Sequence, residues 1–183
     1  LHDKINFVFN PGMQVHSNDV LLLKSAVTED PWPGIRLNIK SGDENRHTTL
    51  VFDAAMSAGK DPGYDVGIFG GHSVLSIYTA LPGNDIGINF VRQALPVYEI
   101  EKTAIPVGID FEAGGEVNFS AVTIPIGSNR YWLEDRQTGT FTDLTSKSYT
   151  VTLPAKSYGT GRFYIISSAN TPTGSEKPQL EDR

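Results

Sequence analysis

The chain has 183 residues, with 18 glycines, 11 prolines and no cysteine, and its formal net charge is −6 at pH 7. The absence of cysteine excludes a disulfide scaffold, a cysteine-ligated zinc site and a cysteine nucleophile. The acidic balance and the lack of any Lys/Arg run argue against a nucleic-acid partner, because phosphate binding needs a concentrated basic surface.

Period-2 alternation predicts strands at residues 5–9 and 35–39, which Asn10-Pro11-Gly12 and Ser41-Gly42-Asp43 end. Residues 20–24 are predicted to form a buried strand, and residues 49–52 another short strand. Residues 53–57 contain Ala54, Ala55 and Met56, which favour a single helical turn that Gly59 ends. Strands therefore dominate from the start.

Two hairpins are predicted in the middle of the chain from apolar alternation on both sides of a glycine-containing turn. The first joins residues 75–79 to 86–90 through 82–85, and the second joins 107–111 to 117–121 through 113–115. Three further strands follow within 130–144, 149–153 and 163–166. The turn residues Gln137-Thr138-Gly139 let the first of these segments fold back on itself. The last segment is apolar on both faces, as expected for a covered central strand.

About ten short strands at this spacing predict an all-β fold, a two-sheet antiparallel β-sandwich of jelly-roll type. Residues 1–166 form one domain in this interpretation, with the place of 1–34 left open, and the Ser/Thr/Pro/Gly-rich residues 167–183 form a linker or tail. The apolar run at 20–23 is too short to span a bilayer. Because no signal peptide begins at Leu1, we expect a processed chain or a fragment of a larger protein.

Several motifs, taken in order, resemble the β-sandwich modules that precede the C-terminal sorting domain in cargo proteins of the Bacteroidetes type IX secretion system. The match spans roughly residues 35–166 and is carried by ordered short motifs, none of which is specific by itself. They are Asp61-Pro-Gly-Tyr-Asp65, Leu75-Ser-Ile-Tyr78, Ile86-Gly-Ile-Asn89, Ile105-Pro-Val-Gly108, Leu133-Glu134-Asp135, Thr138-Gly139, Asp143-Leu144, Tyr149 and Arg162-Phe163.

This resemblance implies a secreted or cell-surface location and an adhesive or accessory role within a larger protein. It implies protein partners at the cell surface or in the secretion machinery, and it implies no catalytic residues.

Catalytic motifs are incomplete in this sequence, so we predict that the chain is not an enzyme. Ser73 lies in Gly71-His72-Ser73-Val74-Leu75, where a nucleophile elbow needs glycine at the last position. Gly59-Lys60 lacks the other residues of a phosphate loop. The four histidines, His2, His16, His47 and His72, do not occur at metal-ligand spacing, and Glu99 and Glu101 fall on one strand face, where a solvated surface is the ordinary interpretation.

Asp61 and Asp65 flank the turn Pro62-Gly63, and two interpretations remain open for them. Carboxylates and outward-pointing carbonyls around a tight turn are suited to Ca²⁺, although a calcium loop gathers six to eight oxygens. Alternatively, the two side chains cap backbone amides of the turn.

Three aromatic residues at loop-like positions, Trp32, Tyr64 and Tyr98, are candidate ligand-binding residues. Exposed aromatic rings stack on sugars, whereas the alternative for Trp32 is a plug at the edge of the core, with its indole N–H bonded to a carbonyl. Trp132, in a strand pattern, is assigned to packing.

The leading hypothesis is a non-catalytic, secreted or cell-surface module for adhesion, display or assembly, as part of a type IX secretion cargo. The alternatives are a carbohydrate-binding module, which adds polysaccharide as a partner, and an accessory domain of a secreted hydrolase.

Overall fold

The computed structural model describes residues 32–68, 74–83, 87–97 and 103–173, all within one compact unit that runs from Pro31 to Arg183. The regular elements among these residues are eleven strands and no α-helix. They are β1 (Gly34–Ser41), β2 (Glu44–Phe52), β3 (Val66–Gly67), β4 (Leu75–Thr79), β5 (Phe90–Leu95), β6 (Ile105–Phe111), β7 (Gly115–Ile124), β8 (Arg130–Asp135), β9 (Thr140–Asp143), β10 (Tyr149–Leu153) and β11 (Phe163–Ser168). The predicted all-β class is therefore confirmed.

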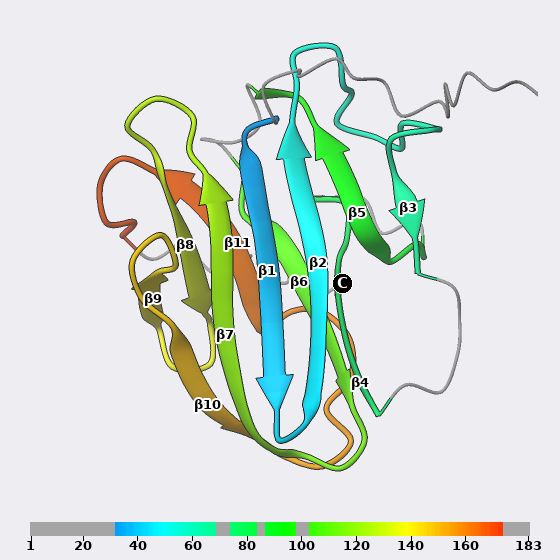
Figure 1. Ribbon diagram of the computed structural model, residues 1–183, viewed down its shortest axis with the longest axis vertical. Coiled ribbons are helices and arrows are strands. Elements are labelled where there is room, and N and C mark those ends of the chain that lie inside the picture. Colours follow the sequence, from blue (N-terminus) through cyan, green and yellow to red (C-terminus); the bar gives the residue numbers. More distant parts are fainter. Residues whose placement is uncertain (1–31, 69–73, 84–86, 98–102, 174–183) are drawn as a thin grey trace, which may run out of the picture. The chain divides into compact units, whose positions relative to one another are not determined.

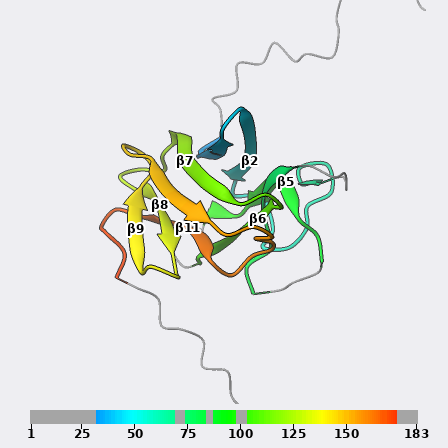
Figure 2. The ribbon, with the colours of Figure 1, turned by 90° about the horizontal axis from the view of Figure 1, so that it is seen from below.

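The strands form one continuous path in the order β10-β7-β1-β2-β5-β4-β6-β11-β8-β9, with β3 paired to β5 beside it. Figure 1 shows β7, β1, β2 and β5 side by side in the near layer, with β6 and β11 behind them. Figure 2 shows the path curling round on itself, which makes a nearly closed, barrel-like sheet. Two separate sheets are not confirmed.

Apolar side chains from both halves of the path fill the interior. Phe119 of β7 packs against Phe163 of β11 with ring centroids 4.9 Å apart, and Phe52 of β2 stacks with Tyr131 of β8 at 6.5 Å. Each contact joins strands that are far apart in the hydrogen-bonded order. The burial of such rings supplies much of the driving force for curling the sheet.

The second predicted hairpin is wrong. Residues 107–111 and 117–121 do form strands, but β6 pairs with β4 and β11, whereas β7 pairs with β1 and β10. The glycines of the connection let the chain cross from one half of the path to the other: Gly114 has φ +69°, and a Cβ there would lie 2.4 Å from the backbone nitrogen of Ala155. Alternation predicts a strand but does not select its neighbour.

Two other local predictions are confirmed. The hairpin within 130–144 forms as β8 and β9, and the strand at 163–166, β11, is central between β6 and β8. In contrast, β4 and β5 share only the pair Thr79–Phe90, and residues 53–57 form a turn in which Asp53 accepts the Ala55 amide. The strands expected at 5–9 and 20–24 lie outside the described residues.

Candidate functional site

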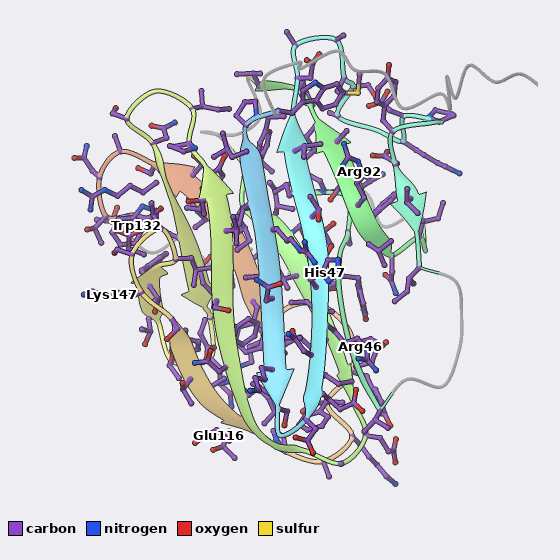
Figure 3. All side chains as sticks on the ribbon, in the orientation of Figure 1. Arg46, His47, Arg92, Glu116, Trp132 and Lys147 are labelled. Carbon is purple, nitrogen blue, oxygen red and sulfur yellow. The ribbon has the colours of Figure 1, made fainter. Side chains whose placement is uncertain are left out.

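The outer face of β1 and β2 is built by simple alternation. Ile35, Leu37 and Ile39 point inward and are fully buried, so the residues between them, Arg36 and Lys40 among them, point outward. The same alternation on β2 turns His47 outward. Figure 3 shows His47 on the near face, together with Arg92 of β5. We call Arg36, Lys40, His47 and Arg92 the cationic face.

Strand register places five outward residues in line across five strands. Arg36 is opposite Val122 on one side and Thr49 on the other, Thr49 is opposite Arg92, and Arg92 is opposite Val66. We call these five residues the outer row. With a strand spacing of about 4.8 Å, the row is roughly 19 Å long and the two arginine Cα atoms are roughly 10 Å apart. Its ends are apolar and exposed, since Val122 is 66% and Val66 43% accessible.

The positive charges of this face are not neutralised by neighbouring acids. In the part of the chain that the structure describes, no carboxylate lies within ion-pair distance of Arg36, Lys40 or Arg92. Glu116, the outward acid of β7, lies near the lower end of the sheet in Figure 3, whereas Arg92 of β5 lies near the upper end. A chain of net charge −6 thus collects like charge on one sheet face.

His47 contributes a polar but uncharged group at neutral pH. Nη2 of Arg36 lies 3.2 Å from both ring nitrogens of His47. Partial burial and the neighbouring guanidinium lower the pKa of His47 from its usual value, so the imidazole is neutral at pH 7. Arg36 donates toward the neutral ring, which helps to fix the position of the guanidinium.

Two of the three predicted aromatic residues come together. The rings of Trp32 and Tyr64 stack with centroids 5.6 Å apart and an interplanar angle of 20°. Trp32 is half-buried, whereas Tyr64 is 45% exposed. Trp32 lies two residues before the start of β1, and Tyr64 lies two residues before Val66 of the outer row. The stacked pair is therefore close in sequence both to the start of β1 and to the Val66 end of the outer row. Tyr98 lies outside the described residues.

Asp61 and Asp65 tie the loop that carries Tyr64. Asp61 accepts the Ser57 amide at 2.8 Å, and Asp65 accepts the amides of Asp61 and Ala94, each at 2.7 Å. The Ala94 bond joins the loop to β5 and so holds Tyr64 near the outer row. Among the described residues, no group of three or more His, Asp or Glu side chains is placed to hold a metal ion. The calcium interpretation stays a prediction.

The two acids of the Leu-Glu-Asp motif, Glu134 and Asp135, are buried on β8 and form ion pairs there. Asp135 of β8 accepts two hydrogen bonds from Arg162, at 3.0 and 2.8 Å, one from the Tyr149 hydroxyl at 2.8 Å and one from the Gln137 amide at 3.0 Å. Burial alone would raise the pKa of Asp135, but these bonds together hold it below its usual value. The network links β8, β10 and the start of β11.

Neighbouring groups extend this network. Arg136 bonds to Glu134 and lies over the Tyr164 ring, 3.4 Å from its centroid. Trp132 donates its indole N–H to the Ser168 carbonyl at 3.1 Å and is largely buried, in the packing role expected from its strand position. The Trp132 bond joins β8 to the adjacent β11, and the Tyr149 bond joins β8 to β10 from the far end of the strand order, so these contacts hold the fold together.

A hollow of about 570 Å³ opens beside β4, and its lining is poor in reactive side chains. Tyr78, Asn89 and Thr160 contribute polar groups, among glycines and Pro106. The Tyr78 hydroxyl already donates to Asp110 at 3.0 Å, and burial together with that carboxylate raises the tyrosine pKa. The Tyr78 hydroxyl is therefore not poised to exchange a proton near neutral pH.

The remaining catalytic candidates are not assembled in the described region. His2, His16, His72, Ser73, Glu99 and Glu101 lie outside it, while Lys60 is exposed on the loop before Asp61. His47 alone joins the candidate site. Arg36 and Arg92 are not among the residues predicted from the sequence. The alternation of Arg36, Asn38 and Lys40 with buried residues is a usable signal for Arg36, whereas only the pairing of β2 with β5 reveals Arg92.

Comparison of the sequence with protein-family models and with curated proteins, and of the structure with solved structures, found no match. The helices needed to cross a bilayer were also not found: within the described residues, none is both long and apolar enough. The type IX secretion resemblance stays a prediction carried by the motifs.

Proposed function

We propose that this chain is a non-catalytic binding module of a secreted or cell-surface protein, acting in adhesion, display or assembly as part of a type IX secretion cargo. The observation that carries the binding role is the outer row, which exposes two arginines whose Cα atoms are roughly 10 Å apart on paired strands. A rigid sheet presents such groups with little loss of conformational entropy on binding. The secreted location rests on the motif resemblance.

The finer fold description belongs to the same proposal. We propose that the strands act as two facing layers of a jelly-roll-like sandwich, with β10, β7, β1, β2, β5 and β3 in one layer and β4, β6, β11, β8 and β9 in the other. Support comes from the junction between β5 and β4, which is a single residue pair, Thr79 with Phe90. Only the first layer carries the cationic face.

The Trp32–Tyr64 stack favours a second candidate, a carbohydrate-binding module. An exposed ring beside polar and charged side chains is a common arrangement for holding a sugar. An accessory domain of a secreted hydrolase is a third candidate, and the same face would then serve to hold substrate for a catalytic domain elsewhere.

Retention on the surface of the source cells tests the binding role. The full chain, labelled with a fluorophore, is compared with an Arg36→Gln/Arg92→Gln variant and with Lys147→Gln/Lys156→Gln, which removes the same charge from exposed positions outside the outer row. We expect the arginine variant to lose retention and the lysine variant to keep it. Equal retention of all three proteins would refute the role of this face.

A further inference from the structure

We propose that the outer row binds an acidic polysaccharide, a glycan chain that carries carboxylates, laid across β7, β1, β2 and β5. This inference rests on the proposed binding function and names its ligand class. Arg36 and Arg92 would each hold a carboxylate, Thr49 and its neighbours would hold hydroxyls, and Tyr64 would stack on a sugar ring at the end of the row.

Charge complementarity is the first argument. Arg36, Lys40 and Arg92 share one face without a carboxylate within ion-pair distance among the described residues, although acids outnumber bases in the chain by 21 to 15. An anionic ligand would supply the partners that these three cations lack among the described residues. Arginine suits a carboxylate ligand, because the planar guanidinium binds a carboxylate through two parallel hydrogen bonds.

The side chains between the charges distinguish a sugar from other polyanions. On the outer face, neutral hydrogen-bonding groups surround the arginines: Thr49 lies between them, and Asn38, Ser120 and Asn118 lie beside Arg36 and Lys40. Hydroxyl and amide groups match the many hydroxyls of a glycan. Nucleic acid needs a denser array of cations than three spread over this face.

The position of the row within the sheet argues against a peptide. Arg36 and Thr49 lie on strands that are paired on both sides, so their backbone N–H and C=O groups are already used in the ladder. A peptide that binds by strand addition needs a free edge. Recognition on this face depends on side chains alone, which suits a ligand with its own hydroxyls and carboxylates.

The spacing agrees with a glycan chain. The two arginine Cα atoms are roughly 10 Å apart, about the length of a disaccharide. Long arginine side chains adjust this distance, and His47 restrains that of Arg36. The Trp32–Tyr64 stack then lies beyond the charged part of the row, where a further sugar ring would meet the exposed face of Tyr64.

Calorimetry with the full chain tests the proposal, using polygalacturonate as the acidic glycan, its fully methyl-esterified form as the matched neutral glycan, and polyglutamate as the acidic peptide. We expect polygalacturonate alone to bind well, with affinity falling as salt is raised. Loss of either guanidinium should weaken binding about tenfold, the usual worth of a charge-assisted hydrogen bond. Tyr64→Ala should also weaken it, and Tyr64→Phe should restore it.

Equal binding of the esterified glycan, or equal binding by the Arg36→Gln/Arg92→Gln variant, would overturn the proposal. Tighter binding of polyglutamate would identify an acidic peptide as the ligand instead. If no polymer binds while cell-surface retention still depends on Arg36 and Arg92, the binding function stands and the glycan inference fails. Circular dichroism of each variant confirms that it is folded, and Lys147→Gln/Lys156→Gln is the charge-matched control.

Discussion

Two charged regions of this protein differ in how their charges are satisfied. Around Asp135, which is 1% exposed, every hydrogen bond acceptor of the carboxylate has a donor within the chain. On the cationic face, the guanidiniums of Arg36 and Arg92 are exposed and have no carboxylate beside them among the described residues. A closed network stabilises a fold, whereas an open set of like charges is available to a partner.

The two regions have different roles. The motif residues between Leu133 and Phe163, which carry much of the family resemblance, hold strands together. The residues that we propose to bind are scattered over β1, β2 and β5 and form no motif. Changes in the first region should therefore alter stability, and changes in the second should alter binding.

The largest expected effect is that of Asp135→Ala on stability. The variant leaves Arg162 without its carboxylate partner. Breaking a buried ion pair costs about 3 kcal/mol or more, and we expect the lower value because Arg162 is partly exposed. The free energy of unfolding in urea measures the loss. Asp43→Ala, at an exposed turn, should change it by less than about 0.5 kcal/mol. Equal effects would show that the network is not special.

Acid should weaken the same region. The folded-state pKa values of Asp135 and Asp143 are lowered: burial opposes this, but hydrogen bonds from Arg162 and Tyr149, and from Thr145 and Ser146, outweigh it. Their stabilisation is complete above the unfolded pKa of about 3.9 and is lost as pH falls through the lower folded values. The contribution of these two carboxylates to the urea midpoint should be constant from pH 7 to 5 and should fall below pH 4. The fall should be less steep in the Asp135→Ala variant than in the unsubstituted protein.

Tyr149→Phe should have a moderate effect. The change removes only the hydroxyl that donates to Asp135 at 2.8 Å, and a hydrogen bond to a charged group contributes about 1.5 kcal/mol or more. Tyr158 is 57% exposed, so Tyr158→Phe is the matched control and should be neutral. A neutral Tyr149→Phe would mean that Arg162 alone satisfies the carboxylate.

Gln93 offers a gain in stability. Its side chain is fully buried, and among the residues that the structure describes neither amide atom has a hydrogen-bond partner. Replacement by leucine removes two unsatisfied groups at similar volume, so we expect Gln93→Leu to raise the free energy of unfolding by about 1 kcal/mol. Thr48→Val should act in the opposite direction, because the Thr48 hydroxyl donates to the Phe90 carbonyl at 3.0 Å. Thermal unfolding would show a raised melting temperature for Gln93→Leu and a lowered one for Thr48→Val.

The smallest expected change in stability belongs to Arg36→Gln/Arg92→Gln. Both side chains are exposed and lack ion pairs within the described region, so the free energy of unfolding should change by less than about 0.5 kcal/mol. The same variant should abolish binding. A loss of stability comparable with that of Asp135→Ala would place these arginines in the scaffold and remove the contrast between the regions.

Prediction from sequence succeeded where a property is local and failed where it depends on distant contacts. Alternation predicted β1, β4 and β10, because the pleat turns successive side chains to opposite faces, and the turn residues 137–139 predicted the β8–β9 hairpin. The same alternation occurs in β6 and β7, and a glycine-containing turn suggested a hairpin that does not form. Trp32 and Tyr64 were both candidates, although their stacking was not foreseen.

The amino-acid sequence by itself determined that this is an all-β protein, which residues face inward, and where the chain turns, because these follow from side-chain periodicity and from glycine and proline. Only the tertiary structure decided the neighbours of each strand. The parallel pairing of β2 with β5 brings Arg92 beside Thr49, and β11 brings Arg162 to Asp135. Such contacts join residues far apart along the chain, and burial of the whole core selects them, so no short window of sequence contains them.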